Sequence, residues 1–319
     1  MANPLVSVII PCFNSERYLR STLNSVLAQT LSDFEIIAVD DCSTDSTPRI
    51  LAKYAEQDSR IIIIRHEKNS GRPAYSKNTA LKAIRGKYVS LLDHDDLFLP
   101  DKLRVSVDML EKYPECVAAF HDIELVDSDG NMLSRYLGSF LDDARDYLEP
   151  DESGYFICKG DFYKFQSIRY AALHTISTTI CPERIAGDIS FDVSYGICDD
   201  TDLWVRLGMA GSIAYSPSIL ASYRQHETNI TRDQDKWDRE TLLYLQKNRE
   251  RIKGRLLPAE DAALRRRISD TFANQGWHMR CVGRHGAATR AYLKALLWRP
   301  GMAQVFNVVK ALFPVRYQA

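Results

Sequence analysis

The stretch YVSLLDHDDLFLP, residues 88–100, joins an apolar run directly to a cluster of like charges. The apolar run suits a buried strand, and three acidic residues, Asp93, Asp95 and Asp96, follow it. Two carboxylates one residue apart at a strand end can point at one place, where a hard divalent cation would offset their repulsion. Asp95 or Asp96 could instead cap a helix that starts near Pro100. The spacing alone leaves both alternatives open.

The segments around this stretch alternate between strand-like and helical patterns, with short links. This alternation predicts an α/β fold with a mainly parallel sheet and helices on both faces. In such sheets ligands bind beyond the carboxyl ends of the strands. The predicted strands are 5–10, 34–41, 60–66, 87–93 and 116–127, and the helices are 15–30, 43–58, 72–86 and 99–114.

The other predicted strand ends also carry polar residues. Asp40 and Asp41 end the second strand, where a carboxylate could accept hydrogen bonds from a ribose or a base, or could simply form a turn. The segment HEKNSGRPAYSKN, residues 66–78, follows the third strand. Its Arg72 and Lys77 could face phosphate, and a solvated basic turn is the alternative.

Two features about a hundred residues later have the same ambiguity. Asp199 and Asp200 precede an apolar helical pattern, so either could be a general base or a helix cap. Asp202 is spaced to pair with Arg206 at i, i+4. His226, in YRQH, could be a metal ligand or a neutral strand histidine.

The composition is that of a soluble globular protein of 319 residues, with 45% hydrophobic residues and a net charge of −1. It gives no indication of a nucleic-acid partner. The seven cysteines are scattered without a C-x-x-C pair, so we expect reduced thiols and a cytoplasmic protein. We also expect neither a signal peptide nor a transmembrane helix.

The region from 233 onward has a helical pattern, with predicted helices 234–253, 258–281, 286–298 and 302–313. From residue 271 it contains no Asp or Glu but seven Lys and Arg residues, the last being Arg316. Apolar stripes on the last two helices predict either contact with an anionic membrane surface or packing on the chain itself or a second subunit.

The strand-end motifs, taken in order, resemble family 2 glycosyltransferases of the GT-A fold. The resemblance rests on VSVIIPCFN, FEIIAVDDCSTDST, NSGRPAYSKNTAL, GKYVSLLDHDD, CDDTDLWVRL and YRQH, which lie within residues 5–232. It implies a catalytic domain at 1–232, with a nucleotide-sugar half at about 1–98 and an acceptor half at about 99–232. Residues 233–319 then form a helical C-terminal extension.

The resemblance also implies roles for individual residues. Asp200 would be the catalytic base, and Asp93, Asp95 and His226 would hold Mn²⁺ or Mg²⁺ on the diphosphate. His174, Thr175, Ser177 and Asp199 would face the acceptor. The nucleotide sugar would be held by Pro11, Phe13, Asn14, Asp40, Asp41, Asn69, Gly71, Lys77, Asn78, Asp93 and His94.

The implied reaction is an inverting transfer of a hexosyl or N-acetylhexosaminyl group from a nucleoside-diphosphate sugar, expected to be a UDP-sugar. The acceptor would be a glycan or a lipid-linked hydroxyl in cell-envelope polysaccharide biosynthesis, at the inner face of the membrane. Two departures from the family pattern are Lys77 in place of Arg and Asp199 in place of Glu. The alternatives are an inactive nucleotide-sugar-binding module and a nucleotidyltransferase, but PCFNSERY lacks the Gly-rich basic loop that the latter needs.

Overall fold

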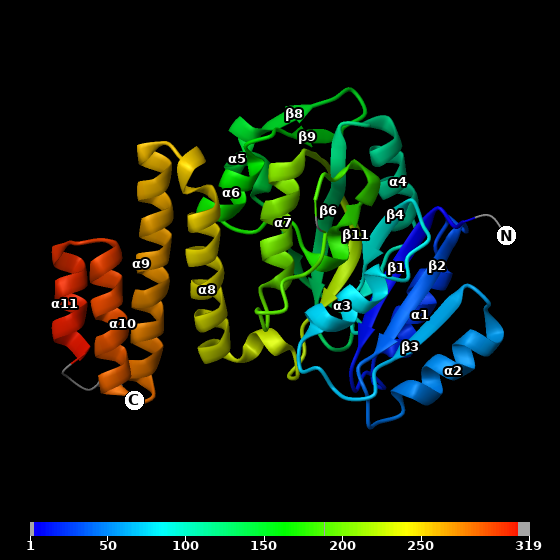
Figure 1. The fold of residues 1–319 in the computed structure, drawn as a ribbon, viewed down its shortest axis with the longest axis horizontal. Helices are drawn as coiled ribbons and strands as arrows, with labels where there is room; N and C mark the ends of the chain where they lie inside the picture. The colour runs from blue at the N-terminus through cyan, green and yellow to red at the C-terminus, as the bar shows by residue number, and fades with distance from the viewer. Residues whose placement is uncertain (1–2, 188, 312–319) are drawn as a thin grey trace. The chain divides into compact units, whose positions relative to one another are not determined.

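The computed structural model describes residues 3–187 and 189–311 (Figure 1). The chain divides into two compact units. Unit 1 comprises Met1–Phe165 and Ala171–Glu227, and unit 2 comprises Gln166–Tyr170 and Thr228–Ala319.

The core of unit 1 is a mixed sheet in which the order of the main path is β3-β2-β1-β4-β10-β6-β11-β9-β8. β1 pairs in parallel with β2 and β4, β2 with β3, and β6 with β11, while β10 runs antiparallel between β4 and β6. β5 adds to β11 and β7 to β6. The strands are β1 (Val6–Cys12), β2 (Phe34–Asp40), β3 (Ile61–Arg65), β4 (Tyr88–Leu91), β5 (Leu97–Phe98), β6 (Cys116–Val126), β7 (Met132–Arg135), β8 (Leu148–Pro150), β9 (Phe156–Cys158), β10 (Thr179–Ile180) and β11 (Ser212–Arg224).

The helices of unit 1 shield this sheet from water. β1 and β2 are buried along their whole length, which is why their sequences are apolar on both faces. α1 buries Leu19, Leu23 and Val26, spaced as one helical face. The helices are α1 (Leu19–Leu27), α2 (Thr47–Gln57), α3 (Pro73–Leu81), α4 (Lys102–Lys112), α5 (Phe140–Asp143), α6 (Phe162–Ile168, which continues into unit 2) and α7 (Asp199–Ala210).

The order of the first four strands reverses at β1. The chain runs outward from β1 through β2 to β3 and then returns to place β4 on the other side of β1 (Figure 1). Such a reversal separates the connections that follow neighbouring strands, and the edge beyond it is where open α/β sheets bind ligands. The carboxyl ends of β1, β2 and β4 bring Asn14, Asp40 and Asp93 to this edge.

The predicted parallel α/β core is confirmed, and one detail of the prediction is wrong. The third helix, predicted to run over 72–86 until Gly86, ends at Leu81. Gly86 instead lies against β1, where an added Cβ would stand 2.5 Å from the Ser7 nitrogen and 2.8 Å from the Val6 carbonyl carbon. Between residues 136 and 197 the chain supplies the short strands β8, β9 and β10, the last at the centre of the sheet.

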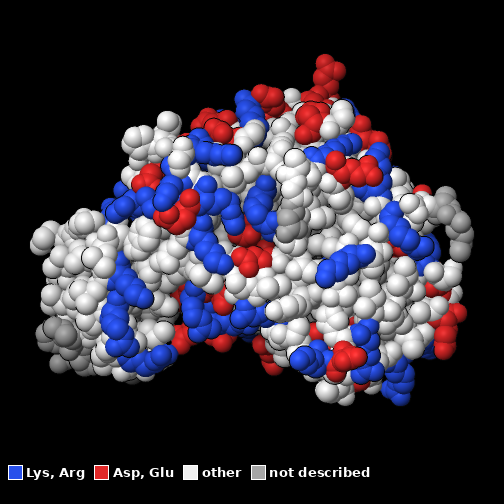
Figure 2. All heavy atoms as spheres, viewed as in Figure 1, with Lys and Arg blue, Asp and Glu red and all other residues white. Residues whose placement is uncertain are grey.

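Unit 2 contains the helices α8 (Gln234–Ile252), α9 (Pro258–Cys281), α10 (His285–Trp298) and α11 (Met302–Ala311). The end of the predicted last helix, 312–313, and Arg316 lie outside the described residues. The Arg249 guanidinium donates to Asp261 at 2.7 Å, and the ring of His278 pairs with Asp238 at 2.8 Å. On the face drawn in Figure 2, white and blue atoms cover α10 and α11, since the sequence has no acidic residue after 270.

Replacing Gly86 with alanine tests the close approach to β1. We expect Gly86→Ala to lower the free energy of unfolding by about 1–3 kcal/mol, because rigid backbone must move to accept the methyl group. Gly160→Ala is the control, since no atom lies within 4 Å of the corresponding Cβ. Urea denaturation of both variants checks this, and equal losses would contradict it.

Candidate active site

The turn at 93–96 is fastened to the end of β11. Asp96 is fully buried, and its Oδ1 accepts the Arg224 backbone N–H at 2.8 Å. The Arg224 side chain donates through Nε to the Asp95 carbonyl at 3.0 Å. The helix-cap alternative for Asp95 and Asp96 is therefore wrong, because α4 begins later, at Lys102, and Asp96 binds β11 instead. Burial, with the charges of Asp95 and Asp93, raises the pKa of Asp96 well above its usual value.

Asp95 and His226 form the pair at this turn that is suited to a cation. The His226 Nε2 lies 2.9 Å from the Asp95 Oδ2, and both side chains are largely buried. Burial opposes ionisation of Asp95, but His94 and His226 together outweigh it and lower the pKa of this carboxyl. Burial, opposed by Lys77 and reinforced by Asp95, raises the pKa of Asp93.

Oxygen and imidazole donors of this kind fit Mn²⁺ or Mg²⁺. Carboxylates that repel each other also favour a cation between them. Within residues 3–187 and 189–311, however, no three His, Cys, Asp or Glu side chains form a complete ligand group. The protein donors fit such an ion in chemistry, and they leave several of its coordination positions to be supplied by another molecule.

The ends of β1 and β2 are joined by polar contacts. Asn14 adopts a left-handed backbone, with φ of 48°, and its side chain accepts the Thr44 N–H at 2.9 Å. Asp40 accepts the Ser43 N–H at 3.0 Å and lies 3.2 Å from the Arg65 guanidinium. The predicted turn role of Asp40 is thus present, and its Oδ2 also faces a cation. Pro11 is buried in β1, whereas Phe13 is exposed beside it.

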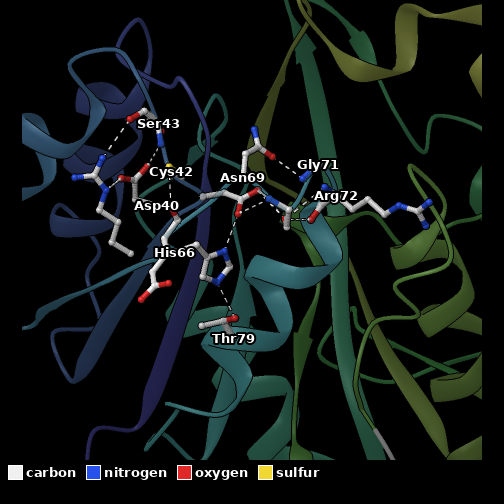
Figure 3. A network of polar contacts seen from close by, with 12 residues as sticks. Asp40, Cys42, Ser43, His66, Asn69, Gly71, Arg72 and Thr79 are labelled. Atoms are coloured by element: carbon white, nitrogen blue, oxygen red, sulfur yellow. Dashed lines mark hydrogen bonds and ion pairs between the residues drawn. The ribbon is translucent and has the colours of Figure 1, made fainter.

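Asp41 holds the loop that follows β3. Its carboxylate lies 2.6 Å from His66 Nδ1 and accepts both the N–H and the hydroxyl of Ser70 (Figure 3). His66 reaches α3 through Thr79, at 2.9 Å. Next to Ser70, Gly71 has φ of +74° and donates its N–H to the Asn69 side chain. The predicted loop residues therefore come together, with the Asp41 oxygens engaged by this loop.

Polar side chains at the start of α3 and within it contact the segment 191–199. Lys77 and Asp199 are buried with Lys77 Nζ 3.0 Å from the Asp199 Oδ2. The Asn78 amide makes two hydrogen bonds with the backbone of Phe191, at 2.7 and 2.8 Å. Arg72 donates to the Val193 carbonyl. The solvated-turn alternative for Lys77 is therefore wrong, and α3 holds the segment that leads to α7.

The electrostatics of Lys77 and Asp199 reflect this burial. Burial opposes the Lys77 charge, but Asp199, Asp93 and Asp200 together outweigh it and raise the pKa of the ammonium group. Burial likewise raises the pKa of Asp199 to about 6, with Lys77 opposing and Asp200 adding to the shift. The two shifts place Lys77, Asp199, Asp200 and Asp93 within one electrostatic environment.

Asp200, in the first turn of α7, is oriented by a threonine from another segment. Its Oδ2 accepts the Thr175 hydroxyl at 2.9 Å, and its Oδ1 accepts the Thr201 N–H at 2.6 Å. This contact with residue 175 goes beyond simple helix capping. The predicted pair of Asp202 with Arg206 is confirmed at 2.9 Å.

The rings of His174, Tyr136 and Tyr223 form a cluster next to Thr175. The His174 ring lies edge-on to Tyr136 and Tyr223, with centroids 5.6 and 4.8 Å away. Burial lowers the pKa of His174, opposed by Asp200 and Asp93, so this ring lies close to the acidic centre. Ser177 is buried, and its hydroxyl stabilises the local turn by donating to the His174 carbonyl at 3.0 Å.

Sequence reasoning missed several of these residues. The ring of Tyr18 lies 4.8 Å from the His226 ring, tilted by 33°, and the Arg224 guanidinium lies 4.8 Å from its centroid. The roles of Arg224 and Tyr136 depend on pairing across the sheet, which no local pattern reveals. The histidine at 66 had a usable signal, since it follows a predicted strand and shares its segment with the Asn-x-Gly loop.

Comparison with known proteins gives a consistent result. Residues 7–170 match the model of Glycosyl transferase family 2. TuaG of Bacillus subtilis, named as a teichuronic acid biosynthesis glycosyltransferase, is 42% identical over 42% of this chain and 52% of its own length. An uncharacterized glycosyltransferase of Rickettsia typhi is 30% identical over 72% of this chain and 66% of its own length. The chain thus spans about half to two thirds of these curated relatives.

Solved structures share the fold. Staphylococcus aureus TarS in complex with UDP-GlcNAc superposes with a TM-score of 0.61 at 19% identity, over 97% of this chain and 79% of TarS 1-349. The mannosyltransferase PcManGT from Pyrobaculum calidifontis, in complex with GDP-Man and Mn²⁺, gives 0.61 at 16% identity, over 98% of this chain and 80% of its own. These likenesses confirm the GT-A fold with C-terminal helices.

The buried pair of Lys77 and Asp199 generates a stability prediction. We expect Lys77→Met to lower the free energy of unfolding by about 3–5 kcal/mol, because Asp199 is left buried without its cation. The control is Arg145→Met, which breaks an exposed pair with Asp142 and should cost less than about 1 kcal/mol.

Urea denaturation at a pH above the pKa of Asp199 measures both losses. The double variant Lys77→Met/Asp199→Leu should recover part of the loss, because neither charge is then left alone. A loss in Lys77→Met no larger than that of the control would contradict the assigned role of the pair.

Proposed function

The chain belongs to glycosyl transferase family 2, and we propose that it is an inverting glycosyltransferase that moves a sugar from a nucleoside-diphosphate donor to an acceptor hydroxyl. The observation that carries this proposal is the position of Asp200. Its carboxylate is oriented by the Thr175 hydroxyl, and after burial and Asp95 it adds to the raised pKa of Asp93 in the turn that follows β4. One carboxylate is thus available for the acceptor while others face the leaving group.

In the proposed reaction Asp200 removes the proton of the acceptor hydroxyl. The acceptor oxygen forms a bond to the anomeric carbon as the bond from that carbon to the diphosphate breaks. The leaving nucleoside diphosphate takes the electron pair, and a single displacement inverts the anomeric centre. The Thr175 hydroxyl keeps one Asp200 oxygen in place, and assistance by such a base is typically worth about 10²–10⁴-fold in rate.

Asp95, His226 and Asp93 would hold Mn²⁺ or Mg²⁺, with the diphosphate oxygens as further ligands. The ion would supply positive charge to the leaving group. Asn14, Asp40 and Phe13, at the ends of β1 and β2, would receive the nucleoside. Asp41 would position the loop that contains Asn69 and Gly71 beside the diphosphate, through its bonds to Ser70. His94 would also lie beside the diphosphate. The buried Pro11 would lie behind the nucleoside.

Lys77 and Asn78 would contribute to the donor site indirectly, by holding the segment that leads to Asp200 in place. Their contacts with Asp199 and with the Phe191 backbone connect α3 to the segment before Asp200. Acceptor contacts are assigned to His174, with Tyr136 and Tyr223 providing aromatic surface for a sugar ring. Thr175 would orient Asp200, and Ser177 would hold the turn at His174. Asp199 would fix the start of α7 through Lys77.

We further propose residues 1–232 as the catalytic domain, with its nucleotide-sugar half at about 1–98 and its acceptor half at about 99–232. A UDP-linked hexose or N-acetylhexosamine is the expected donor, supported by the UDP-GlcNAc complex of the TarS structure. A glycan or lipid-linked acceptor of cell-envelope polysaccharide synthesis, at the inner face of the membrane, is supported by the name of the Bacillus subtilis relative.

Substitution of the base separates catalysis from binding. We expect Asp200→Asn to reduce the Mn²⁺-dependent hydrolysis of a UDP-sugar by about 10²–10⁴-fold, because the amide cannot take the proton. The rise in melting temperature caused by UDP with Mn²⁺ should be kept. Asp142→Asn, at an exposed position, is the control for loss of one negative charge. A variant at 200 that retains most of its activity would eliminate the base assignment.

Removal of a proposed metal ligand has a readout independent of turnover. We expect Asp95→Ala to abolish the increase in UDP affinity that Mn²⁺ produces in calorimetric titration, because His226 then lacks its carboxylate partner. Binding of UDP without metal should change little. An unaltered Mn²⁺ effect would show that the ion is held elsewhere.

A further inference from the structure

The last two helices of unit 2 expose large apolar side chains in continuous stripes. On α11 these are Met302, Val305, Phe306 and Val309, spaced i, i+3, i+4 and i+7 on one helical face. On α10 they are Leu293 and Leu297, at i and i+4. Leu297 and Met302 are 77% and 82% exposed. Isolated exposed apolar residues are ordinary, but adjacent stripes of large ones indicate an interaction surface.

These stripes are not the faces with which the helices pack inside unit 2. α10 buries Ala288, Ala291, Tyr292 and Ala295 on its opposite side, and Tyr292 lies close over Gly276 of α9. α11 is fixed to α9 through a 3.4 Å hydrogen bond from Gln304 to Ser269. The core of the helical unit is therefore complete without the exposed stripes.

The Lys, Arg, Asp and Glu side chains that the structure describes on α10 and α11 are all cations. Arg290 and Lys294 share the exposed face of α10 with its two leucines, and Lys310 lies over the Phe306 ring at 4.6 Å on α11. The sequence contains no Asp or Glu after residue 270, so the surface has no carboxylate of its own on these two helices. A surface with apolar side chains and cations alone complements anionic lipid headgroups over acyl chains.

The dimensions of the helices determine the mode of contact. α10 has 14 residues and α11 has 10. In the part of the chain that the structure describes, no helix has both the length and the apolar character needed to cross a bilayer. Contact would therefore take place in the interfacial layer, with each helix lying along the surface.

We propose that the exposed faces of α10 and α11 form a docking surface for an anionic membrane. The surface consists of Leu293, Leu297, Met302, Val305, Phe306 and Val309 with the flanking cations Arg290, Lys294 and Lys310. The apolar side chains enter the headgroup boundary, and the cations bind lipid phosphate. Docking is independent of the transfer chemistry, so the two can fail separately.

The test is co-sedimentation of the full chain with vesicles of phosphatidylcholine containing about one third phosphatidylglycerol, compared with pure phosphatidylcholine. We expect binding to the anionic vesicles that weakens as salt is added. Leu297→Ser/Phe306→Ser should lower the partition coefficient by about tenfold or more. The matched control is Leu257→Ser/Trp277→Ser, which removes an exposed leucine just before α9 and an exposed aromatic residue on it.

A second pair of variants tests the charges. Lys294→Glu/Lys310→Glu should lower partitioning by about 25-fold or more, since each cation near the surface is worth about fivefold. Lys53→Glu/Arg239→Glu changes the net charge equally at exposed sites on α2 and α8 and should bind nearly as the unaltered chain does. Melting curves of all variants should remain unchanged, because every substituted side chain is exposed.

Several outcomes would overturn the proposal. One is a lack of binding to anionic vesicles by a folded chain, and another is equal behaviour of the test and control variants. Sedimentation velocity supplies the third: a dimer that Leu297→Ser/Phe306→Ser dissociates, without vesicle binding, would make this face an interface between two copies. Donor hydrolysis without vesicles should be the same in all variants, so its loss would bear on the proposed function instead.

Discussion

Mutual repulsion among carboxylates is the constraint on which the site depends. Asp93, Asp95, Asp96, Asp199 and Asp200 lie around one edge of the sheet, and several of them raise one another's pKa. Four of them are held by a particular donor from another segment: Asp96 by the Arg224 backbone, Asp95 by His226, Asp199 by Lys77 and Asp200 by Thr175. Without these donors, folding would leave buried charges unpaired, at a cost of several kcal/mol each.

Because these donors are remote in sequence, their contacts with the carboxylates also join distant segments of unit 1. Lys77 and Asp199 are 122 residues apart, and Arg224 and Asp96 are 128 apart. The first contact ties α3 to α7, and the second ties the turn after β4 to the end of β11. The geometry of the site is therefore a product of the complete fold of unit 1, with β10 completing the sheet between β4 and β6.

The sequence predicted the parallel core because β1 and β2 are apolar on both faces, a local property that survives folding. It also located the acidic residues, since strand ends are read from where apolar runs stop. It could not predict β10, whose two residues pair through long-range contacts, nor the role of Gly86, which comes from the closeness of β1. The partners of Asp96 and Asp200 were hidden for the same reason. Spacing shows that a carboxylate is near a strand end but gives no information about which donor faces it.

The contacts made by α3 have a consequence for the evolution of new specificities. Residues that would receive the donor precede about residue 98, and those on the acceptor side follow it, so recombination near this point would exchange one half for another. Such a hybrid inherits α3 from one parent and α7 from the other. Its stability depends on whether the ammonium at 77 meets a carboxylate at 199 and the amide at 78 meets the backbone at 191. The buried pair of Lys77 and Asp199 therefore limits which sequences of the two proposed halves can be combined, even where each half could change its own specificity separately.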